Sequence, residues 1–239
     1  MNGTLEVRVL GAHDAVPAEA GGADRLEIVG EPADDGRSPE PRTVAAIRSR
    51  TNVHLRPVVR LREGYSTDGG ELVRLRGLVA SYLDAGADGL VLGFLNGLGE
   101  VDAEVIGALL DGYHCPWTFS RAFDTVLDHD DAWEAVLGLP GLDGVRTAGS
   151  ARTLEHGLDD LLRRARANPR VASLVVVDGS LHPDHVPWLA RAGVRQFHLD
   201  DQVRPGGSRR AYVDEALVRS WRTLVDTEVK HAREAGGQV

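Results

Sequence analysis

GADRLEIV (residues 22–29) and GADGLVLG (residues 86–93) repeat one pattern, a Gly-Ala-Asp turn followed by a short apolar run. The pattern is typical of a helix that ends in a turn before a buried strand begins. Six further runs are rich in apolar and β-branched residues: LEVRV (5–9), NVHLRPV (52–58), PWTFS (116–120), GVRT (144–147), SLVVV (173–177) and RQFHL (195–199). Ala- and Leu-rich segments with helical periodicity separate these runs, so we predict βα units that build a parallel sheet.

The spacing of the eight runs favours one closed barrel. They start about 20 to 37 residues apart, and a strand with its crossover helix needs roughly 30 residues. We therefore predict an α/β fold, a single (β/α)8 TIM-type barrel over residues 1–239, a length that such barrels commonly reach as one domain. The amphipathic segment 212–229 is expected to be the last helix, and residues 230–239 a frayed tail.

The composition excludes several classes of protein. The formal net charge of −9 opposes binding to nucleic acid, and an anionic small molecule would need a local basic pocket. Cys115 is the only cysteine, so an internal disulfide and a Cys-rich metal cage are excluded. Lys230 is the only lysine and lies near the C-terminal end, so no core strand can supply a Schiff-base lysine.

The sequence also lacks signals for a membrane. No apolar run approaches the roughly 18 residues of a spanning helix, and the segment MNGTLEVRVL does not have the basic and then apolar pattern of a secretory signal. We expect a cytoplasmic protein without a membrane partner and without a nucleotide cofactor.

Charged side chains occupy one face of three of the predicted strands. The pairs are Glu6 and Arg8, Arg25 and Glu27, and His54 and Arg56. Because side chains alternate along a strand, these groups point into the barrel while the apolar residues meet the helices. An unpaired charge there would cost several kcal/mol. Two interpretations stay open: a Glu/Arg network that fixes strand register, or a site in which Glu6 and Glu27 move protons and Arg56 binds a ligand.

Further polar residues follow the strands, at the end where barrel enzymes carry their chemistry. We predict that Arg60, Arg121, Thr147 and His198 bind a ligand there, and that Asp124 is a third catalytic carboxylate. The alternative for Arg121 and Asp124 is a salt bridge that holds a loop. Thr147 could equally cap the following helix.

Two loop clusters are candidates for binding metal or phosphate. His182 and His185 follow the seventh strand and His198 closes the eighth, so we predict these three histidines as metal ligands. Alternatively, His182 with the proline that follows it begins a helix. The loop VRPGGSRR (203–210) combines glycines and arginines where many barrels hold a phosphate, or it is a solvated loop or an oligomer contact.

Five blocks of the sequence resemble the CutC family, called copper homeostasis proteins. The blocks are AEAGGADRLEI (18–28), GADGLVLGFLNGLGEVD (86–102), PWTFSRAFD (116–124), GVRTAGSARTLEHGLDDL (144–161) and RQFH (195–198). The resemblance covers most of residues 5–200. It implies a TIM-like barrel, often a homo-oligomer, with a polar cavity that receives Glu6, Glu27, Arg121 and Asp124, and it matches His198 to the family's closing histidine.

The sequence departs from the family pattern at several positions. Ser120 stands where the family usually has histidine, and Arg8 and Val29 stand where it has cysteines. Arg56 comes two residues early, with Val58 in the arginine's usual place. Because Cu(I) prefers sulfur ligands, the sequence supports membership of the family more strongly than copper binding.

Three functions are consistent with these observations. The first is a CutC-like copper homeostasis protein that binds a copper ion at a polar site in the C-terminal mouth. The second is a lysine-independent enzyme, of the lyase or isomerase type, on a small carboxylate or phosphate compound. The third is a non-catalytic binding barrel. The expected partners are accordingly a small anionic ligand or a metal ion, together with further copies of the chain.

Overall fold

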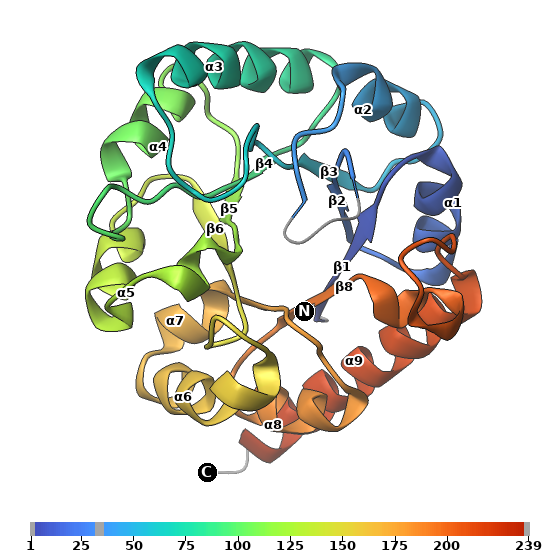
Figure 1. Ribbon diagram of the computed structural model, residues 1–239. Helices are drawn as coiled ribbons and strands as arrows, with labels where there is room; N and C mark the ends of the chain where they lie inside the picture. Colours follow the sequence, from blue (N-terminus) through green and yellow to red (C-terminus); the bar gives the residue numbers. More distant parts are fainter. Residues whose placement is uncertain (1–2, 32–35, 237–239) are drawn as a thin grey trace.

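Eight parallel strands form the centre of the protein, and the helices surround them (Figure 1). This computed structural model describes residues 3–31 and 36–236. The strands are β1 (Thr4–Val9), β2 (Arg25–Ile28), β3 (His54–Pro57), β4 (Leu90–Leu92), β5 (Trp117–Phe119), β6 (Leu142–Thr147), β7 (Val175–Val177) and β8 (Gln196–Leu199). Each of the eight predicted runs overlaps one of them, so the predicted strands are confirmed.

The sheet closes into a barrel. Its strand order is β3-β2-β1-β8-β7-β6-β5-β4, and the two ends of this order meet where Val58 pairs with Val91. The amide of Val59 donates a hydrogen bond of 2.8 Å to the Val91 carbonyl at the same point. The predicted (β/α)8 TIM-type fold is therefore confirmed.

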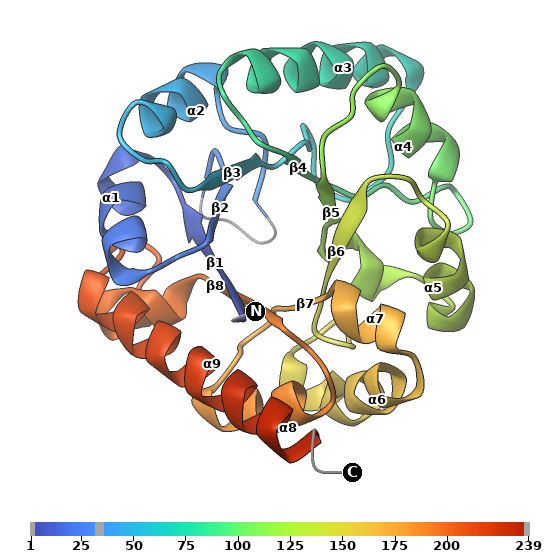
Figure 2. The same cartoon turned by 180° about the vertical axis from the view of Figure 1, so that it is seen from behind.

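The helices form an outer ring, which Figure 2 shows from behind. They are α1 (Ala12–Gly21), α2 (Pro41–Arg48), α3 (Gly69–Asp84), α4 (Ala103–Leu110), α5 (His129–Leu137), α6 (Leu154–Ala167), α7 (Pro169–Leu174), α8 (Val186–Arg191) and α9 (Glu215–Gly236). Short 3-10 turns η1 (Arg121–Thr125), η2 (Pro183–His185), η3 (Asp201–Val203) and η4 (Pro205–Gly207) follow strands β5, β7 and β8. None of the described helices is long and apolar enough to cross a membrane.

The last helix is longer than the sequence indicated. Residues 230–236 continue α9 where a frayed tail was expected, and 237–239 lie outside the described residues. Val225 and Val229 on this helix are buried against the barrel, and Lys230 lies 3.9 Å from Glu234 one turn further on. Buried apolar contacts and an i,i+4 ion pair both favour continuation of the helix.

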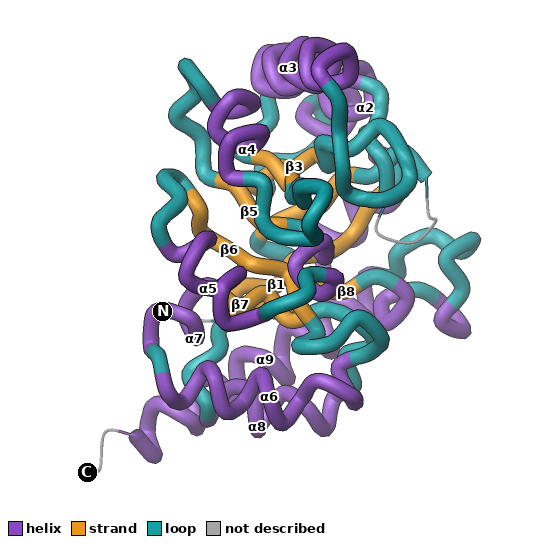
Figure 3. Tube along the Cα trace, turned by 60° about the vertical axis from the view of Figure 1, so that its left-hand side comes forward, coloured by secondary structure: helices purple, strands orange, loops and turns teal. Residues whose placement is uncertain are grey.

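The strands separate an apolar shell from a polar interior. Leu5, Val7 and Val9 of β1 are fully buried on the side that meets the helices, while Glu6 and Arg8 point into the barrel, as their alternation predicted. Figure 3 shows the strands enclosed by helices and loops. The charged residues of the strands are thus held inside a rigid, water-poor enclosure.

Small residues on one wall make room for long side chains from the other. A Cβ on Gly89 of the β4 wall would lie 3.3 Å from Arg56 Nε. One on Gly144 of β6 would lie 2.8 Å from Val176 Cγ2 and 3.2 Å from Thr118 Oγ1. Because Gly89, Thr118 and Gly144 are small, the interior accommodates the long side chain of Arg56, which a barrel filled with branched apolar side chains could not hold.

Candidate functional site

Glu27 lies at the centre of a buried charge network inside the barrel. Its carboxylate accepts a hydrogen bond of 2.6 Å from Arg8 Nε and a second from Arg146 Nη1. Glu27 and Arg146 are both 0% exposed. A carboxylate removed from water needs such charged donors to remain ionised. Strands β1, β2 and β6 are therefore joined across the lumen by this one side chain.

His198 connects Glu27 to a second buried carboxylate. Its Nδ1 lies 2.9 Å from Glu6 Oε1, and its Nε2 lies 3.5 Å from Glu27 Oε2. Glu6 also accepts a hydrogen bond from Arg25 Nε. Burial alone would raise the pKa of Glu6, but the charge of Arg25 and the contacts with His198 outweigh it and hold that pKa well below its usual range.

Asp178 lies at the end of the network nearest the C-terminal mouth of the barrel. Its carboxylate lies 3.2 Å from Arg146 Nε and accepts a hydrogen bond of 2.5 Å from the amide of Gly179. Burial would raise the pKa of Asp178, but the charges of His198 and Arg146 outweigh it and lower this pKa. Burial lowers the pKa of Arg146 to about 10, so this guanidinium is still charged at neutral pH.

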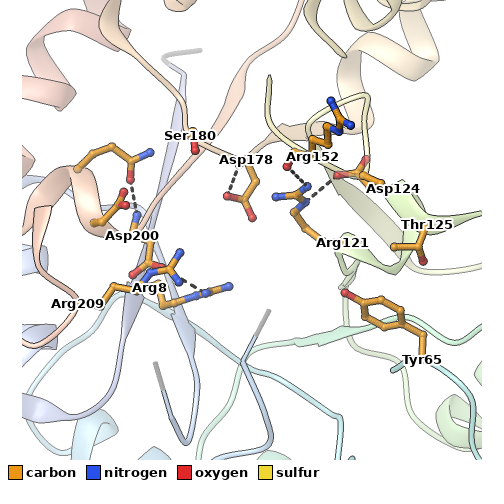
Figure 4. Close-up of a pocket in the computed structure, with 14 residues that line it drawn as sticks. Arg8, Tyr65, Arg121, Asp124, Thr125, Arg152, Asp178, Ser180, Asp200 and Arg209 are labelled. Carbon is orange, nitrogen blue, oxygen red and sulfur yellow. Dashed lines mark hydrogen bonds and ion pairs between the residues drawn. The ribbon is translucent and has the colours of Figure 1, made fainter. Parts of the chain in front are cut away.

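A cavity of about 350 Å³ opens above the network at the C-terminal mouth of the barrel. The charged residues that line it are Arg8, Arg121, Asp124, Arg152, Asp178, Asp200, Asp201 and Arg209 (Figure 4). Arg8 belongs both to the buried network and to the cavity lining. Its Nε binds Glu27 of the network, while its Nη1 lies 3.3 Å from Asp200 in the cavity wall. The mouth and the buried network are therefore one connected set of charges.

Arg121 and Asp124 form a braced pair on the η1 side of the cavity. Arg121 Nε donates a hydrogen bond of 2.7 Å to Asp124, and its Nη2 donates to the carbonyls of Ser150 and Arg152 at 3.2 and 3.3 Å. Asp124 also accepts hydrogen bonds from Thr147 Oγ1 and from a backbone amide of the β6–α6 loop. Burial raises the pKa of Asp124 despite these donors.

The β8–α9 loop is tied to the barrel by ion pairs. Arg204 is 2% exposed and contacts Asp14 at 3.1 Å, and it also donates to the Arg8 carbonyl. Arg209 of the same loop lies 2.9 Å from Asp200 and lines the cavity. Two arginines of the segment considered as a phosphate loop, Arg204 and Arg209, are thus held by carboxylates, and Arg209 is placed at the mouth.

The structure assembles only part of the predicted site at the mouth. Arg121 and Asp124 line the cavity, and Thr147 supports Asp124 instead of capping α6. Glu6, Glu27 and His198 lie beneath the cavity lining, in the buried network. The network interpretation of the two glutamates is therefore the one that their contacts support.

Arg56 lies deep in the barrel, whereas Arg60 lies beside the mouth cavity. Arg56 makes a two-pronged contact with Asp143 at 2.6 and 2.5 Å and donates to Thr118 Oγ1, deep in the barrel. The Arg60 guanidinium lies 5.2 Å above the Tyr65 ring and lines a separate surface cavity. The position of Arg56 does not favour its predicted contact with a ligand in the mouth, whereas that contact of Arg60, which adjoins Tyr65 of the mouth cavity, stays a prediction.

The three histidines predicted as metal ligands are not brought together. His182 and His185 form an edge-to-face pair with ring centroids 5.6 Å apart, and His182 is exposed. His198 is buried between two glutamates. Within residues 3–31 and 36–236, no group of three or more His, Cys, Asp or Glu residues is placed to hold a metal ion. The expected three-histidine set is therefore corrected to a surface pair and one lumen residue.

Sequence reasoning did not identify Arg146 and Asp178 as site residues. Arg146 lies two residues after Gly144 in β6, just as Arg8 lies two residues after Glu6 in β1. Because residues two apart share one face of a strand, the sequence predicts that Arg146 points into the barrel. Asp178 directly follows β7 and could have been found from its place at a strand end. The pairing of Arg56 with Asp143 across 87 residues left no comparable signal.

The fold and the charged mouth define a TIM-type barrel with a polar site at its C-terminal end. The model of the CutC family matches residues 4–203. CutC family proteins of Xanthomonas campestris pv. campestris (strain B100) and Klebsiella pneumoniae (strain 342) are 30% and 28% identical over 81% of this chain, covering 81% and 78% of their own lengths. The chain belongs to the CutC family.

Solved structures show the same fold. A protein from Streptococcus agalactiae solved under the name copper homeostasis protein CutC has a TM-score of 0.71 at 20% identity, over 82% of this chain and 97% of its own. The phosphoribosyl anthranilate isomerase of Thermococcus kodakaraensis has a TM-score of 0.61 at 14% identity, over 93% and 98%. At these identities the likeness concerns the barrel alone.

Copper, the metal in the name of the S. agalactiae protein, does not fit the described residues of the lumen. Cu(I) prefers sulfur, and the cavity at the mouth is lined by arginines, carboxylates, Tyr65 and small polar residues. Cys115 lines a different cavity, beside α4, and burial raises the pKa of its thiol. Both ring nitrogens of His198 face carboxylates.

The buried carboxylates predict a specific loss of stability in acid. The pKa of Glu6 and that of Asp178 are lower in the folded state than in the unfolded chain. The stability that they contribute is therefore present above about pH 4 and lost as the pH falls below it. Glu6→Gln leaves Arg25 and His198 without their anion, so we expect the variant to be about 3–5 kcal/mol less stable at pH 7.

Urea unfolding between pH 2 and pH 7 measures this effect. The gap between wild type and Glu6→Gln should narrow as the pH falls below about 4, because Glu6 becomes protonated as the wild type unfolds. Glu134→Gln, at an exposed position on α5, is the matched control and should follow the wild-type profile. A gap between wild type and Glu6→Gln that stays constant over the whole range would contradict the ionised network.

Proposed function

We propose that the chain binds a small carboxylate or phosphate compound at the C-terminal mouth and acts on it by acid–base chemistry of the lyase or isomerase type. The observation that carries this proposal is the convergence of Arg8, Arg121 and Arg209 with Asp124 and Asp178 on one cavity. Arginines held in place by carboxylates are suited to an anion, because a guanidinium binds carboxylate or phosphate through two parallel hydrogen bonds.

The cavity residues have distinct roles in this proposal. Arg121 orients the anionic group, since Asp124 and two backbone carbonyls fix the direction of its guanidinium. Asp124 is the candidate proton-transfer group, because its raised pKa is closer to the range in which a carboxyl exchanges protons. The buried Glu27 supports the site by holding Arg8 and Arg146 in position, and Lys230, far along α9 and exposed, takes no part.

Removal of Arg121 tests the anion-binding role. At a malonate concentration one hundred times Kd, binding adds about 2.7 kcal/mol of stability, which corresponds to roughly 5–10 °C in Tm for a chain of this length. We expect Arg121→Ala to lose most of this shift while the free protein stays folded. The measurement is thermal unfolding with increasing malonate at constant ionic strength.

Arg163→Ala is the matched control, because it removes the same charge from an exposed position on α6. It should keep the full malonate shift. An equal shift in Arg121→Ala and wild type would show that Arg121 does not bind the anion. A shift that depends on Arg121, without turnover of any carboxylate or phosphate compound, would favour the third function, a non-catalytic binding barrel.

Copper homeostasis is the second candidate function. It is supported by membership of the CutC family and by the name of the S. agalactiae structure. The pair His182 and His185 on η2 offers imidazole nitrogens at the surface, and imidazole is a ligand that Cu(II) accepts. We propose in addition, from the sequence, that the protein acts in the cytoplasm and as a homo-oligomer.

A titration of the tag-free protein with Cu(II) against a chelator of moderate affinity tests this candidate. We expect one bound copper per chain, lost in the double variant His182→Ala/His185→Ala, with nitrogen hyperfine structure in the electron paramagnetic resonance spectrum of the wild type. Loss of copper binding in His198→Ala, and not in the double variant, would place the copper site in the lumen. Failure of the wild type to compete with the chelator would remove copper binding from the account.

A further inference from the structure

A second cavity, of about 710 Å³, lies on the N-terminal face of the barrel. Its walls include the first residues of β1 and β8, together with the C-terminal ends of α6 and α8, α7, and the end of α9. Figure 2 shows these helices gathered on one side of the ring. Because the polar mouth lies at the opposite ends of the strands, this cavity is separate from the proposed active site.

Five arginines line this N-terminal cavity. They are Arg25, Arg166, Arg191, Arg195 and Arg233. Among the described residues of its lining, Asp143 is the only acid, and Arg56 already binds both of its carboxylate oxygens. The cavity is therefore strongly positive in a chain whose net charge is −9. Such local concentration of one sign attracts ligands of the opposite sign.

Arg25 gives the cavity a buried donor that meets no acceptor among the described residues. Its Nε binds Glu6, but among the described residues no acceptor meets its Nη2. The side chain is 6% exposed and forms part of the cavity lining. Buried charged donors are ordinarily satisfied. The guanidinium therefore adds its charge to the cavity lining, where it attracts an anion.

Arg195 and Arg233 both line the cavity, near enough for the charge of one to act on the other. Burial lowers the pKa of Arg195, and the nearby charge of Arg233 lowers it further. Arg195 Nη1 donates to the carbonyls of Ala190 and Val194 at 2.6 and 2.8 Å, which fixes the guanidinium. Two like charges held close together favour a multivalent anion between them, because its charge relieves their repulsion.

Helix ends provide the competing explanation. Arg166, Arg191 and Arg233 lie in the last turns of α6, α8 and α9, where a cation interacts favourably with the helix dipole. This effect does not require the three helix ends to meet at one cavity, and it does not explain the unsatisfied nitrogen of Arg25 on a strand. If these arginines serve only the helix ends, removing Arg166 and Arg233 should lower the stability of the protein and leave anion binding unchanged. If the cavity binds an anion, the same removal should weaken that binding.

We propose that this N-terminal cavity binds a phosphorylated small molecule, with its phosphate groups among Arg25, Arg195 and Arg233. Alanine side chains from α6, from α7 and from the residue that follows α8 also line the cavity and suit an apolar part of the ligand. Phosphate is the anion that best uses several converging guanidinium groups, because its oxygens accept many charge-assisted hydrogen bonds. The site is independent of the proposed function at the mouth.

Calorimetric titration with inorganic pyrophosphate at fixed ionic strength tests the site. Arg166 and Arg233 are exposed, so the variant Arg166→Ala/Arg233→Ala is expected to fold. Each lost charge-assisted hydrogen bond weakens binding about tenfold or more, and we expect at least that loss in Kd. Arg163→Ala, which removes an exposed arginine of α6 that does not line the cavity, should leave the pyrophosphate Kd unchanged.

Three results would overturn the proposal. The first is a wild type that binds no pyrophosphate at millimolar concentration. The second is a double variant with a lower Tm and an unchanged Kd, because the arginines would then serve only the helix ends. The third is loss of pyrophosphate binding in Arg121→Ala with retention in Arg166→Ala/Arg233→Ala, which would assign the phosphate to the mouth.

Discussion

A carboxylate enclosed in the centre of the barrel must be neutralised, and this requirement organises the interior. Glu27 has no contact with solvent, and it is balanced by Arg8 and Arg146 from two other strands. An isolated charge in such a place would cost several kcal/mol, so the three side chains are stable there only as a set. The set joins β1, β2 and β6, and His198 extends it to Glu6 and β8.

The same requirement connects the interior to the mouth. Arg8 and Arg146 bind Glu27 below and contact Asp200 and Asp178 above. The carboxylates of the cavity are therefore oriented by arginines that the buried layer already fixes, which is the kind of support from beneath that a preorganised site needs. Gly89, just before β4, leaves room in the same lumen for the Arg56 side chain. Fold and site thus depend on one distribution of large and small residues around the lumen.

Alternation and spacing were sufficient to predict the eight strands, the inward direction of Glu6 and Glu27, and the position of Arg121 and Asp124 after β5. They were insufficient where partners meet across the barrel, because the sequence carries no signal for contacts such as that of Arg146 with Glu27, 119 residues apart. The histidines show that sequence alone also did not predict which loop residues lie close together. His198 follows the inward parity of β8, whereas His182 and His185 belong to a surface turn, so neighbouring loops did not make one site.

The central claim is that Glu27 and Arg146 stabilise the fold only as a pair, and a double-mutant cycle tests it most directly. Urea unfolding of wild type, Glu27→Gln, Arg146→Met and the double variant at pH 7 gives the coupling free energy between the two side chains. The account predicts a coupling of roughly 2–3 kcal/mol, with the double variant far less destabilised than the sum of the single variants. Single effects that add to within about 0.5 kcal/mol would contradict it.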